Sequence, residues 1–361
     1  MKKLILLTTI FIFYSITVLS QVTTVISGTS PNQPRDFVIV NDLLYYTIFV
    51  DSINYIDISQ NNPNSTLLAS GIDSPLGIEV KNDFIYFSMP FSGIISKINF
   101  MDSSPTITTV SSLGNTGSGI PTVSPFTLKF IGNELYFSDN NNNKIFKYNI
   151  ISESLTTIVT LSSQDRPSGL EYKDGFLYYA SYDGTINKID ITNPSATPIQ
   201  VVSGLNRPAG LKFKGTELYI ADATNFIPGD GRIVKIDVTQ ALPIIEDVLT
   251  NLYAPAVIDF VSDVMYFREF DRLAKIDLTT LSVNDFNLDE IVLYPNPSKD
   301  YLKISNIKND ISYSIYDING RILKKGIVTK DSKINVSNLI TGCYFIRFIG
   351  ESSSTKKFVK N

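Results

Sequence analysis

The stretch RPAGLKFKGTELYIADATNFIPGDGRIVKID, residues 207–237, contains the pattern on which the fold prediction rests. A tyrosine follows its proline at a distance of eleven residues, and this spacing occurs six times along the chain. The pairs are Pro34/Tyr45, Pro75/Tyr86, Pro125/Tyr136, Pro167/Tyr178, Pro208/Tyr219 and Pro255/Tyr266. Successive prolines lie 41, 50, 42, 41 and 47 residues apart. A period of this length predicts a propeller or a solenoid.

Each repeat carries four short segments of strand-forming residues separated by turn residues. In the repeat that starts at Arg207 these segments cover residues 209–213, 217–221, 232–238 and 246–249. The tyrosine of the second segment lies between apolar or aromatic residues in every repeat, so both faces of that strand are expected to be buried. Four strands in a repeat of this length form one propeller blade. We therefore predict an all-β, six-bladed β-propeller, with a parallel β-solenoid as the alternative.

The two ends of the repeat array predict how the ring closes. From the second repeat onward each proline follows an outer-strand run such as residues 200–203, and residues 22–26 (VTTVI) have the same form. The sixth repeat passes from Asp277 into the linker without such a run. Residues 22–26 are therefore expected to complete the sixth blade, which leaves no open sheet edge between the first and last blades.

Residues 1–20 have the composition of an export signal. Lys2 and Lys3 precede a mostly apolar run, and small side chains precede Gln21. This pattern predicts a signal peptide, with an uncleaved membrane anchor as the alternative. No other stretch is long and apolar enough to span a bilayer. We expect the propeller to cover residues 21–278.

Composition excludes several kinds of chemistry. The chain has no histidine, which rules out Ser–His and Cys–His catalysis and imidazole metal ligands. Cys343 is the only cysteine, so no intrachain disulfide can form. A net charge of −4 without a basic patch argues against a nucleic-acid partner. No set of catalytic residues stands out.

Three runs of the fifth repeat carry a resemblance to known propellers: residues 207–211 (RPAGL), 218–222 (LYIAD) and 233–237 (IVKID). Over residues 22–278 the chain resembles the six-bladed NHL, YWTD and strictosidine-synthase-like propellers. The absence of tryptophan excludes an intact YWTD signature. Because this fold hosts lyases, lactonases, receptors and scaffolds, the resemblance implies the fold and leaves the function open.

The tail is predicted to be a separate module. Residues 279–290 have the character of a linker, and alternating strands with an Asn319-Gly320 turn predict a small Ig-like β-sandwich over residues 291–361. The tail contains, in this order, LYPNP (293–297), YDINGR (316–321), GCYF (342–345) and KFVK (357–360). In these runs it resembles the C-terminal sorting domain of the type IX (Por) secretion system.

The resemblance of the tail implies a route and a partner. The route is passage across the outer membrane of a Bacteroidota-type bacterium, and the partner is the type IX secretion machinery. The protein would then be secreted or attached to the outer-membrane surface.

Charged residues recur four positions after the repeated prolines, on the predicted innermost strand. Around the ring these positions hold Val38, Glu79, Lys129, Glu171, Lys212 and Asp259. Apolar neighbours place the charges on one strand face, so we expect the five charged residues to line the central channel and to pair between blades. Such a belt of ion pairs is mainly structural, and a functional channel site is the alternative.

Propellers usually bind ligands on the face formed by the connections into the inner strand and between the second and third strands. The predicted ligand-binding residues there are Arg35, Asp36, Asp139, Arg166, Tyr182, Arg207, Asp222 and Arg268. Arginine and exposed aromatic residues are common at binding hot spots. For Asp139, in the run DNNNN (139–143), a tight-turn role is the alternative. For Asp222, calcium binding together with Asp230 is an alternative, but the spacing fits no recognised loop.

The favoured function is an extracellular ligand-, glycan- or protein-binding module without catalysis and without a cofactor. A hydrolase or lyase of the lactonase or streptogramin-lyase kind is the alternative, and a purely structural surface protein is a third possibility. Some lactonase-like propellers hold calcium at the channel mouth. Here only Asp36 among the six mouth positions is a carboxylate, and the nearby Lys129 and Lys212 would repel a cation.

Overall fold

The computed structural model divides into two compact units, residues 1–278 and 279–361. It describes residues 22–28, 32–113, 121–162, 165–193, 195–223, 227–281, 292–305, 311–318, 320–329, 333–349 and 353–361. The predicted signal peptide and most of the predicted linker lie outside these residues. The first linker residues form a single helical turn, α1 (Leu278–Leu281). No described helix is long and apolar enough to cross a membrane.

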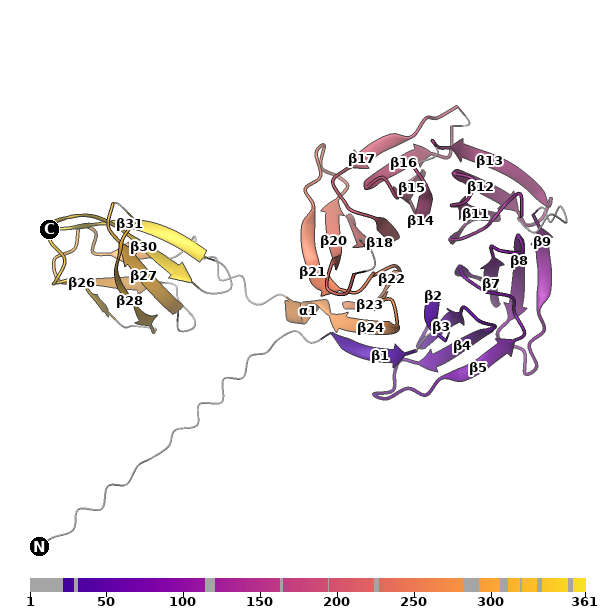
Figure 1. Ribbon diagram of the computed structural model, residues 1–361, viewed down its shortest axis with the longest axis horizontal. Coiled ribbons are helices and arrows are strands. Elements are labelled where there is room, and N and C mark those ends of the chain that lie inside the picture. Colours follow the sequence, from indigo (N-terminus) through magenta and orange to yellow (C-terminus); the bar gives the residue numbers. More distant parts are fainter. Residues whose placement is uncertain are drawn as a thin grey trace, which may run out of the picture. The chain divides into compact units, whose positions relative to one another are not determined.

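The described residues of the first unit form six four-stranded antiparallel sheets arranged in a ring (Figure 1). Blade 1 contains β2 (Pro34–Val40), β3 (Leu43–Ile48), β4 (Ser52–Asp57) and β5 (Thr66–Ser70), and blade 2 contains β6 (Ile78–Lys81), β7 (Phe84–Met89), β8 (Ile94–Asn99) and β9 (Thr108–Ser112). Blade 3 contains β10 (Leu128–Ile131), β11 (Glu134–Asp139), β12 (Lys144–Asn149) and β13 (Ser154–Thr160), and blade 4 contains β14 (Pro167–Lys173), β15 (Phe176–Ser181), β16 (Thr185–Asp190) and β17 (Ile199–Val202). Blade 5 contains β18 (Pro208–Lys214), β19 (Glu217–Asp222), β20 (Gly231–Asp237) and β21 (Glu246–Leu252), and blade 6 contains β22 (Ile258–Val261), β23 (Val264–Arg268), β24 (Arg272–Asp277) and β1 (Thr23–Ser27). The predicted β-propeller is confirmed.

The ring closes through the N-terminal strand. β1 pairs antiparallel with β24, with Thr24 opposite Ala274 and Ile26 opposite Leu273. Val25 and Ile26 pack against the cluster of buried side chains between blades 6 and 1. The prediction that residues 22–26 complete the last blade is therefore confirmed, and the outer strand covers the edge that β24 would otherwise expose.

The repeated tyrosine joins neighbouring blades. All six tyrosines are at most 5 % exposed, on the second strand of each blade. Tyr86, Tyr178 and Tyr219 each meet a phenylalanine of the next blade's inner strand edge-on, with ring centroids 4.8, 5.1 and 4.9 Å apart. An aromatic pair in this geometry stabilises the contact beyond the area that it buries. The tyrosine is thus a contact between blades, which explains why it keeps the period of the blade.

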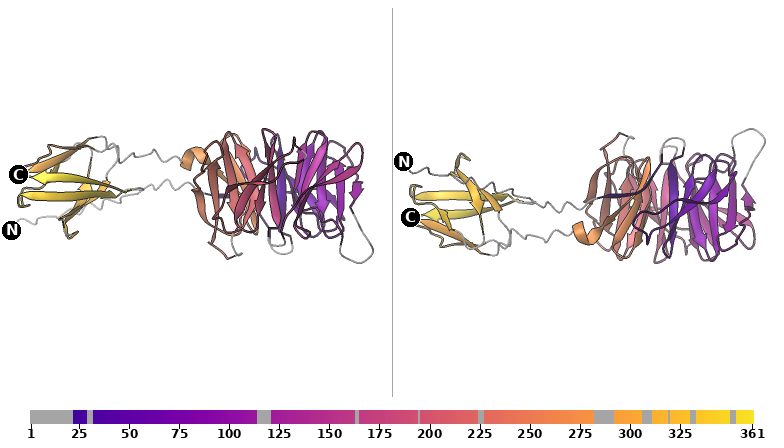
Figure 2. Two further views of the ribbon diagram at one scale, coloured as in Figure 1. Left: turned by 90° about the horizontal axis from the view of Figure 1, so that it is seen from above. Right: turned by 90° about the horizontal axis from the view of Figure 1, so that it is seen from below.

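Glycine is required where the inner strands crowd together. A Cβ on Gly77, Gly169 or Gly210 would lie 2.0, 2.1 or 1.9 Å from a backbone oxygen of the next blade. Since backbone oxygens cannot move aside as flexible side chains do, these positions exclude any larger residue. They bring the inner strands close enough to form a narrow central channel. Figure 2 shows the ring from the side, with the strands running along its axis, so that strand ends form its two faces.

The described residues of the second unit form two antiparallel sheets, as the sequence predicts. One sheet contains β25 (Val292–Tyr294), β26 (Tyr301–Ser305) and β29 (Lys333–Asn335). The other contains β28 (Ile322–Val328), β27 (Ile311–Tyr316), β30 (Gly342–Ile349) and β31 (Ser353–Lys360). Side chains from both sheets, including Leu302, Ile315, Phe348 and Phe358, form one core.

Candidate functional site

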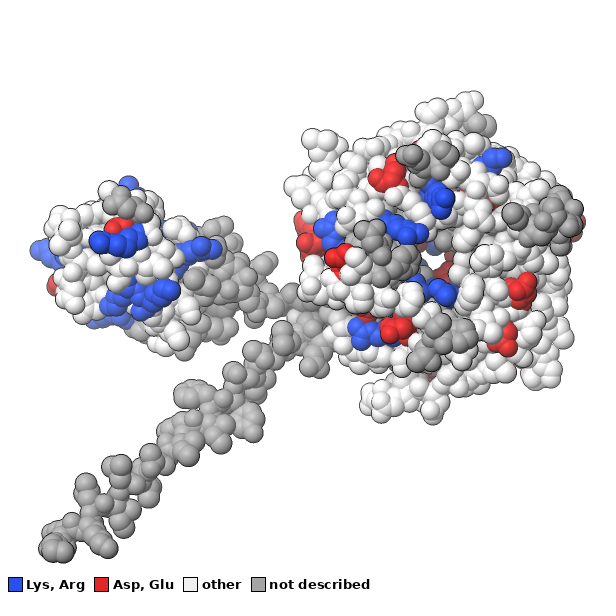
Figure 3. Space-filling view, in the orientation of Figure 1, with Lys and Arg blue, Asp and Glu red and all other residues white. Residues whose placement is uncertain are grey.

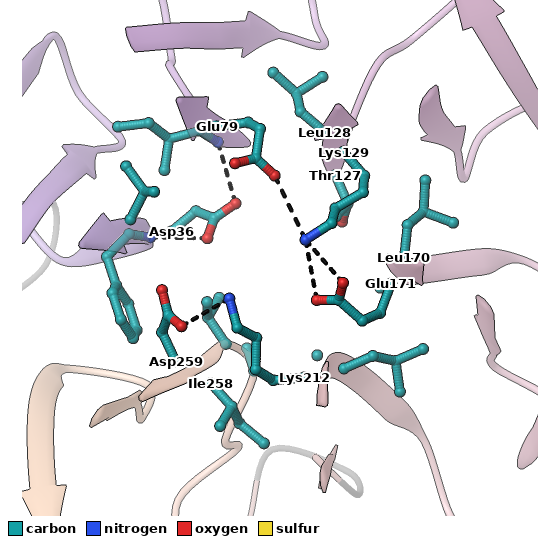
Figure 4. A pocket seen from close by; sticks show the side chains of 18 of the residues that line it. Asp36, Glu79, Thr127, Leu128, Lys129, Leu170, Glu171, Lys212, Ile258 and Asp259 are labelled. Carbon is teal, nitrogen blue, oxygen red and sulfur yellow. Dashed lines mark hydrogen bonds and ion pairs between the residues drawn. The ribbon is translucent and has the colours of Figure 1, made fainter. Parts of the chain in front are cut away.

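Side chains from all six inner strands surround a central cavity of about 90 Å³ (Figure 4). The positions four residues after the repeated prolines contribute Val38, Glu79, Lys129, Glu171, Lys212 and Asp259. The structure thus brings together all five charged residues that the sequence assigns to the channel.

Ion pairs connect these charges across blade boundaries. The Nζ atom of Lys129 lies 2.8 Å from Oε1 of Glu171 in the following blade and 3.9 Å from Oε2 of Glu79 in the preceding one. The Nζ atom of Lys212 lies 2.7 Å from Oδ1 of Asp259. Burial opposes the charge of Lys129, but the nearby carboxylates of Glu171 and Glu79 outweigh it and raise its pKa. Both lysines are therefore occupied by partners within the channel wall.

Asp36 adds a further carboxylate at the channel (Figure 4). Its Oδ1 accepts a hydrogen bond from the Phe37 amide at 2.8 Å, and its Oδ2 accepts one from the Ile78 amide of the next blade at 3.2 Å. Burial raises the pKa of Asp36 to about 7, an effect that the charge of Glu79 increases and that of Arg268 opposes. Near neutral pH this carboxyl group is thus partly protonated.

The channel does not offer a set of cation ligands. Asp36 stands two residues after its proline, and the five corresponding positions hold Gly77, Thr127, Gly169, Gly210 and Val257. Within the described ranges, no group of three or more His, Cys, Asp or Glu residues could hold a metal ion. The alternative of calcium at the channel mouth therefore gains no support from the geometry.

The arginines of residues 22–278 are segregated to one end of the blades. There are six. Arg35, Arg166 and Arg207 stand beside the first residue of an inner strand, Arg232 and Arg272 stand at the start of a third strand, and Arg268 ends a second strand. In an antiparallel blade these strand ends meet at the same edge. We call this end of the ring the arginine face. Figure 3 shows Lys and Arg side chains beside the mouth of the channel.

Aromatic rings accompany three of the strand connections on the arginine face. The Cζ atom of Arg35 lies 4.6 Å from the ring centroid of Phe49, and that of Arg207 lies 4.2 Å from the ring centroid of Tyr182. A guanidinium stacked on a ring in this way can still donate N–H hydrogen bonds in its own plane. At the third connection, Tyr253 and Phe270 stack with centroids 4.7 Å apart.

Phe49, Tyr253 and Phe270 are absent from the residues that the sequence indicates. A signal for two of them exists, because Phe49, Tyr182 and Phe270 each stand four residues after the repeated tyrosine. That position is the start of the turn between the second and third strands, on the arginine face.

Three buried acids occupy the preceding position, three residues after the repeated tyrosine. The Oδ2 atom of Asp139 accepts a hydrogen bond from the amide of Ser124. The Oδ1 atom of Asp222 accepts hydrogen bonds from the amides of Asn206 and Arg207. The Oε1 atom of Glu269 accepts one from the amide of Tyr253. Asp139 and Asp222 are fully buried, and Glu269 is 3 % exposed. Each acid thus fixes the connection that enters its own blade.

This geometry corrects the predicted ligand contacts of Asp139 and Asp222. Asp139 also accepts from the amides of Asn141 and Asn142, in agreement with the alternative of a turn, and Asp222 pairs with Arg232 at 3.1 Å. Because protein donors surround both carboxylates, neither of them presents an oxygen to a ligand.

The other predicted contacts fall into two groups. Arg166 is exposed, Arg35, Tyr182 and Arg207 are partly buried, and all four lie on the arginine face. Arg268 is only 5 % exposed, donating from Nε to the Pro34 carbonyl and from a terminal nitrogen to the Phe270 carbonyl, both at 3.1 Å. Arg268 therefore ties blade 6 to blade 1 and lies beneath the surface.

Comparison with known proteins identifies the tail. Residues 292–361 match the family model of the secretion system C-terminal sorting domain. The tail of this chain therefore directs type IX secretion to the cell surface or the extracellular space. No curated protein matches the chain.

Solved structures support the propeller fold. The chain is similar to a protein of the nidogen/laminin complex (14 % identity, 66 % of this chain and 89 % of the other, TM-score 0.54). It is also similar to a catalytically inactive histidine-to-alanine variant of virginiamycin B lyase from Staphylococcus aureus with quinupristin. The identity is 20 %, the match covers 69 % of this chain and 82 % of the other, and the TM-score is 0.51. A third similar structure is a putative gluconolactonase (8 % identity, 71 % and 91 %, TM-score 0.55). At these identities the likeness is one of fold alone.

Proposed function

We propose that this protein is an exported binding module whose propeller holds an acidic polysaccharide on its arginine face, without catalysis. The observation that carries the proposal is the segregation of all six propeller arginines to that face. An overall positive charge does not explain this segregation of arginines, because the net charge of the chain is −4. In contrast, three lysines end the inner strands at the opposite face, namely Lys81, Lys173 and Lys214.

The chemistry of arginine fits this ligand class. A guanidinium presents a planar fork of N–H donors that matches the two oxygens of a carboxylate or a sulfate, whereas the ammonium of lysine is a point charge. Arg166 and Arg207 begin consecutive blades, and Tyr182 lies between them in the chain and beneath Arg207. An aromatic ring beside two cations suits a sugar ring that carries a negative group, since the ring covers apolar C–H groups while the arginines bind the charge.

A hydrolase or lyase is the weaker alternative. The similar virginiamycin B lyase variant is catalytically inactive with one histidine replaced by alanine, and this chain contains no histidine. Aspartate, glutamate or tyrosine could serve as acid or base. The channel carboxylates, however, are engaged by Lys129, Lys212 or backbone amides.

The organisation that accompanies this function has three parts. Residues 1–20 direct the chain out of the cytoplasm and are removed, residues 21–278 form the binding module, and residues 291–361 engage the type IX machinery after the linker 279–290. Sequencing the N-terminus of the exported protein tests the first part, which requires Gln21 as the first residue.

Binding of polysaccharides to the full exported chain tests the function. Polygalacturonate and chondroitin sulfate serve as acidic probes, with dextran as the neutral control at the same ionic strength. The variant Arg166→Ala/Arg207→Ala is expected to lose binding, whereas Lys81→Ala/Lys173→Ala removes the same charge from the opposite face and is expected to keep it. Equal loss in both variants, or equal binding of dextran, would contradict the proposal. So would preferential binding of polyglutamate, which would assign the face to an acidic protein.

A further inference from the structure

Arg35 carries a partly buried charge that no carboxylate of the described residues pairs with. Its side chain is neither exposed nor paired within 4.0 Å to any acid of the described residues. Its Nε atom is buried and has no hydrogen-bond partner among them. A buried donor without an acceptor destabilises the folded state, so a water, an ion or a ligand usually accepts its hydrogen bond.

A second guanidinium lies beside Arg35. Arg268 donates to the carbonyl of Pro34, the residue directly before Arg35, so both guanidiniums belong to the junction of blades 6 and 1. Burial, and then the charge of Arg35, lower the pKa of Arg268 to about 10. The charge of the buried Arg268 adds to the attraction that Arg35 exerts on an anion at the surface.

The neighbouring acids do not supply this anion. Asp36 accepts from two backbone amides in the channel wall and is partly protonated near neutral pH. Glu269 accepts from the Tyr253 amide and pairs with Arg272. Asp271 attracts Arg268 without forming an ion pair within 4.0 Å. Among the described residues, no acid therefore forms an ion pair within 4.0 Å with Arg35 or Arg268.

Aromatic rings shape the open side of this junction. Phe49 lies under the Arg35 guanidinium, and Phe91 of blade 2 meets Phe49 edge-on with centroids 6.0 Å apart. Phe91 is 54 % exposed, far more than a ring of the core. One face of the guanidinium is thus covered, its Nε–H has no acceptor among the described residues, and an exposed ring adjoins Phe49.

We infer that the guanidinium of Arg35, stacked on Phe49 beside Arg268, forms a subsite for one oxyanion of the ligand, either a carboxylate or a sulfate ester. The inference rests on the proposed function for the polysaccharide that carries this group. Arg35 would donate two parallel hydrogen bonds to the oxyanion, and the exposed ring of Phe91 would pack on the sugar that bears it.

Binding of single anions tests the subsite apart from the polymer. The full exported chain is titrated calorimetrically with sodium glucuronate and with inorganic sulfate, at constant ionic strength set by chloride. We expect saturable binding of at least one of them, and comparison of the two distinguishes the carboxylate source from the sulfate source. Arg35→Ala should weaken binding about tenfold or more, as loss of a charge-assisted bidentate contact does. Arg35→Lys keeps the positive charge and is less disruptive to folding. It should also weaken anion binding, because an ammonium cannot make the bidentate contact.

The control and the contrary results are separate from those of the proposed function. Lys214→Ala, which removes a positive charge from the opposite face, should leave the affinity for the single anion within about twofold, because sites without shared contacts act independently. Wild-type affinity in Arg35→Ala and Arg35→Lys, or no binding beyond that of chloride, overturns the subsite even if polysaccharide binding depends on Arg166 and Arg207. Binding of glucuronate through Arg35 without any polysaccharide binding supports the subsite and refutes the proposed function.

Discussion

The Nζ atom of Lys129 lies 2.8 Å from Oε1 of Glu171, and this contact joins the inner strands of blades 3 and 4 inside the channel. The side chain of Glu171 is 9 % exposed and that of Lys129 is 20 % exposed. An ion pair shielded in this way differs from a surface pair, because either partner becomes a buried charge when the other is removed.

Replacing Lys129 by methionine is expected to destabilise the propeller by about 3 kcal/mol, since Glu171 and Glu79 would both lose their cation. The double variant Lys129→Met/Glu171→Gln should recover most of this loss. Urea unfolding of each variant measures the effect.

Lys147 is the matched control, because its Nζ lies 3.7 Å from Oε1 of Glu134 with both side chains about 30 % exposed. Lys147→Met should change the free energy of unfolding by less than about 1 kcal/mol. Equal changes in the free energy of unfolding for the two lysine variants would show that the channel ion pair stabilises the protein no more than the exposed pair does.

Replacing Gly210 by alanine is expected to destabilise the protein strongly. The new Cβ would stand 1.9 Å from the carbonyl oxygen of Ala256, so β18 and β22 would have to separate. Overpacking of a tight interior costs about 1–3 kcal/mol, and a contact with backbone belongs at or above the upper end. Gly215→Ala is the control, as it meets no atom within 4 Å and has only the strain of its positive φ of 63°. Thermal unfolding compares the two, and a smaller loss for Gly210→Ala would refute the close approach of the inner strands.

Asp36 is expected to make the stability of the propeller fall as pH rises. The folded state holds the proton with a pKa of about 7 against an ordinary value of 3.8, so it binds more protons than the unfolded state between these pH values. The free energy of unfolding should therefore decrease from about pH 4 to about pH 7, by at most about 1.4 kcal/mol for each pH unit. Glu79, whose pKa burial also raises, acts in the same direction.

The variant Asp36→Asn isolates this contribution. It should reduce the difference in free energy of unfolding between pH 5 and pH 8, measured in urea. Asp57→Asn is the control, because hydrogen bonds from Ser59 and Gln60 lower the pKa of Asp57 and move its effect below pH 4. An unchanged pH dependence in Asp36→Asn would show that its carboxyl group titrates normally. Asp36 shares the channel with Glu79, Lys129, Glu171, Lys212 and Asp259, so the same series in Glu79→Gln separates the two acids.

The sequence predicts the fold wherever a residue repeats with the period of the blade. The tyrosine of each second strand is buried between blades, so the same packing selects the same residue six times. The outer strand β1 was predictable for a related reason. Its pattern matches the strand that the sixth repeat lacks, and an open edge would be left without it.

The site was harder to predict because the end of a strand does not fix where its side chain points. Asp139 and Asp222 stand at a loop-facing strand end, yet their carboxylates turn back to accept backbone amides. Phe49 follows the same strand end in blade 1 and instead underlies Arg35. Only the contact partners distinguish these roles, and the partners come from a different segment of the chain.

The N-terminal strand offers a test of ring closure by complementation. Deleting residues 21–28 should remove the cover of β24 and the packing of Val25 and Ile26, at a cost of about 3 kcal/mol or more. Proteolysis should then cleave the ring faster, because an open edge allows blade 6 to separate. A synthetic peptide of residues 21–28 should restore resistance, whereas a scrambled peptide should not, since it cannot place Ile26 opposite Leu273. The point variants Ile26→Asn and Thr23→Asn provide a graded comparison, because Ile26 faces the core and Thr23 is exposed. Full resistance after the deletion would mean that blade 6 is stable with three strands.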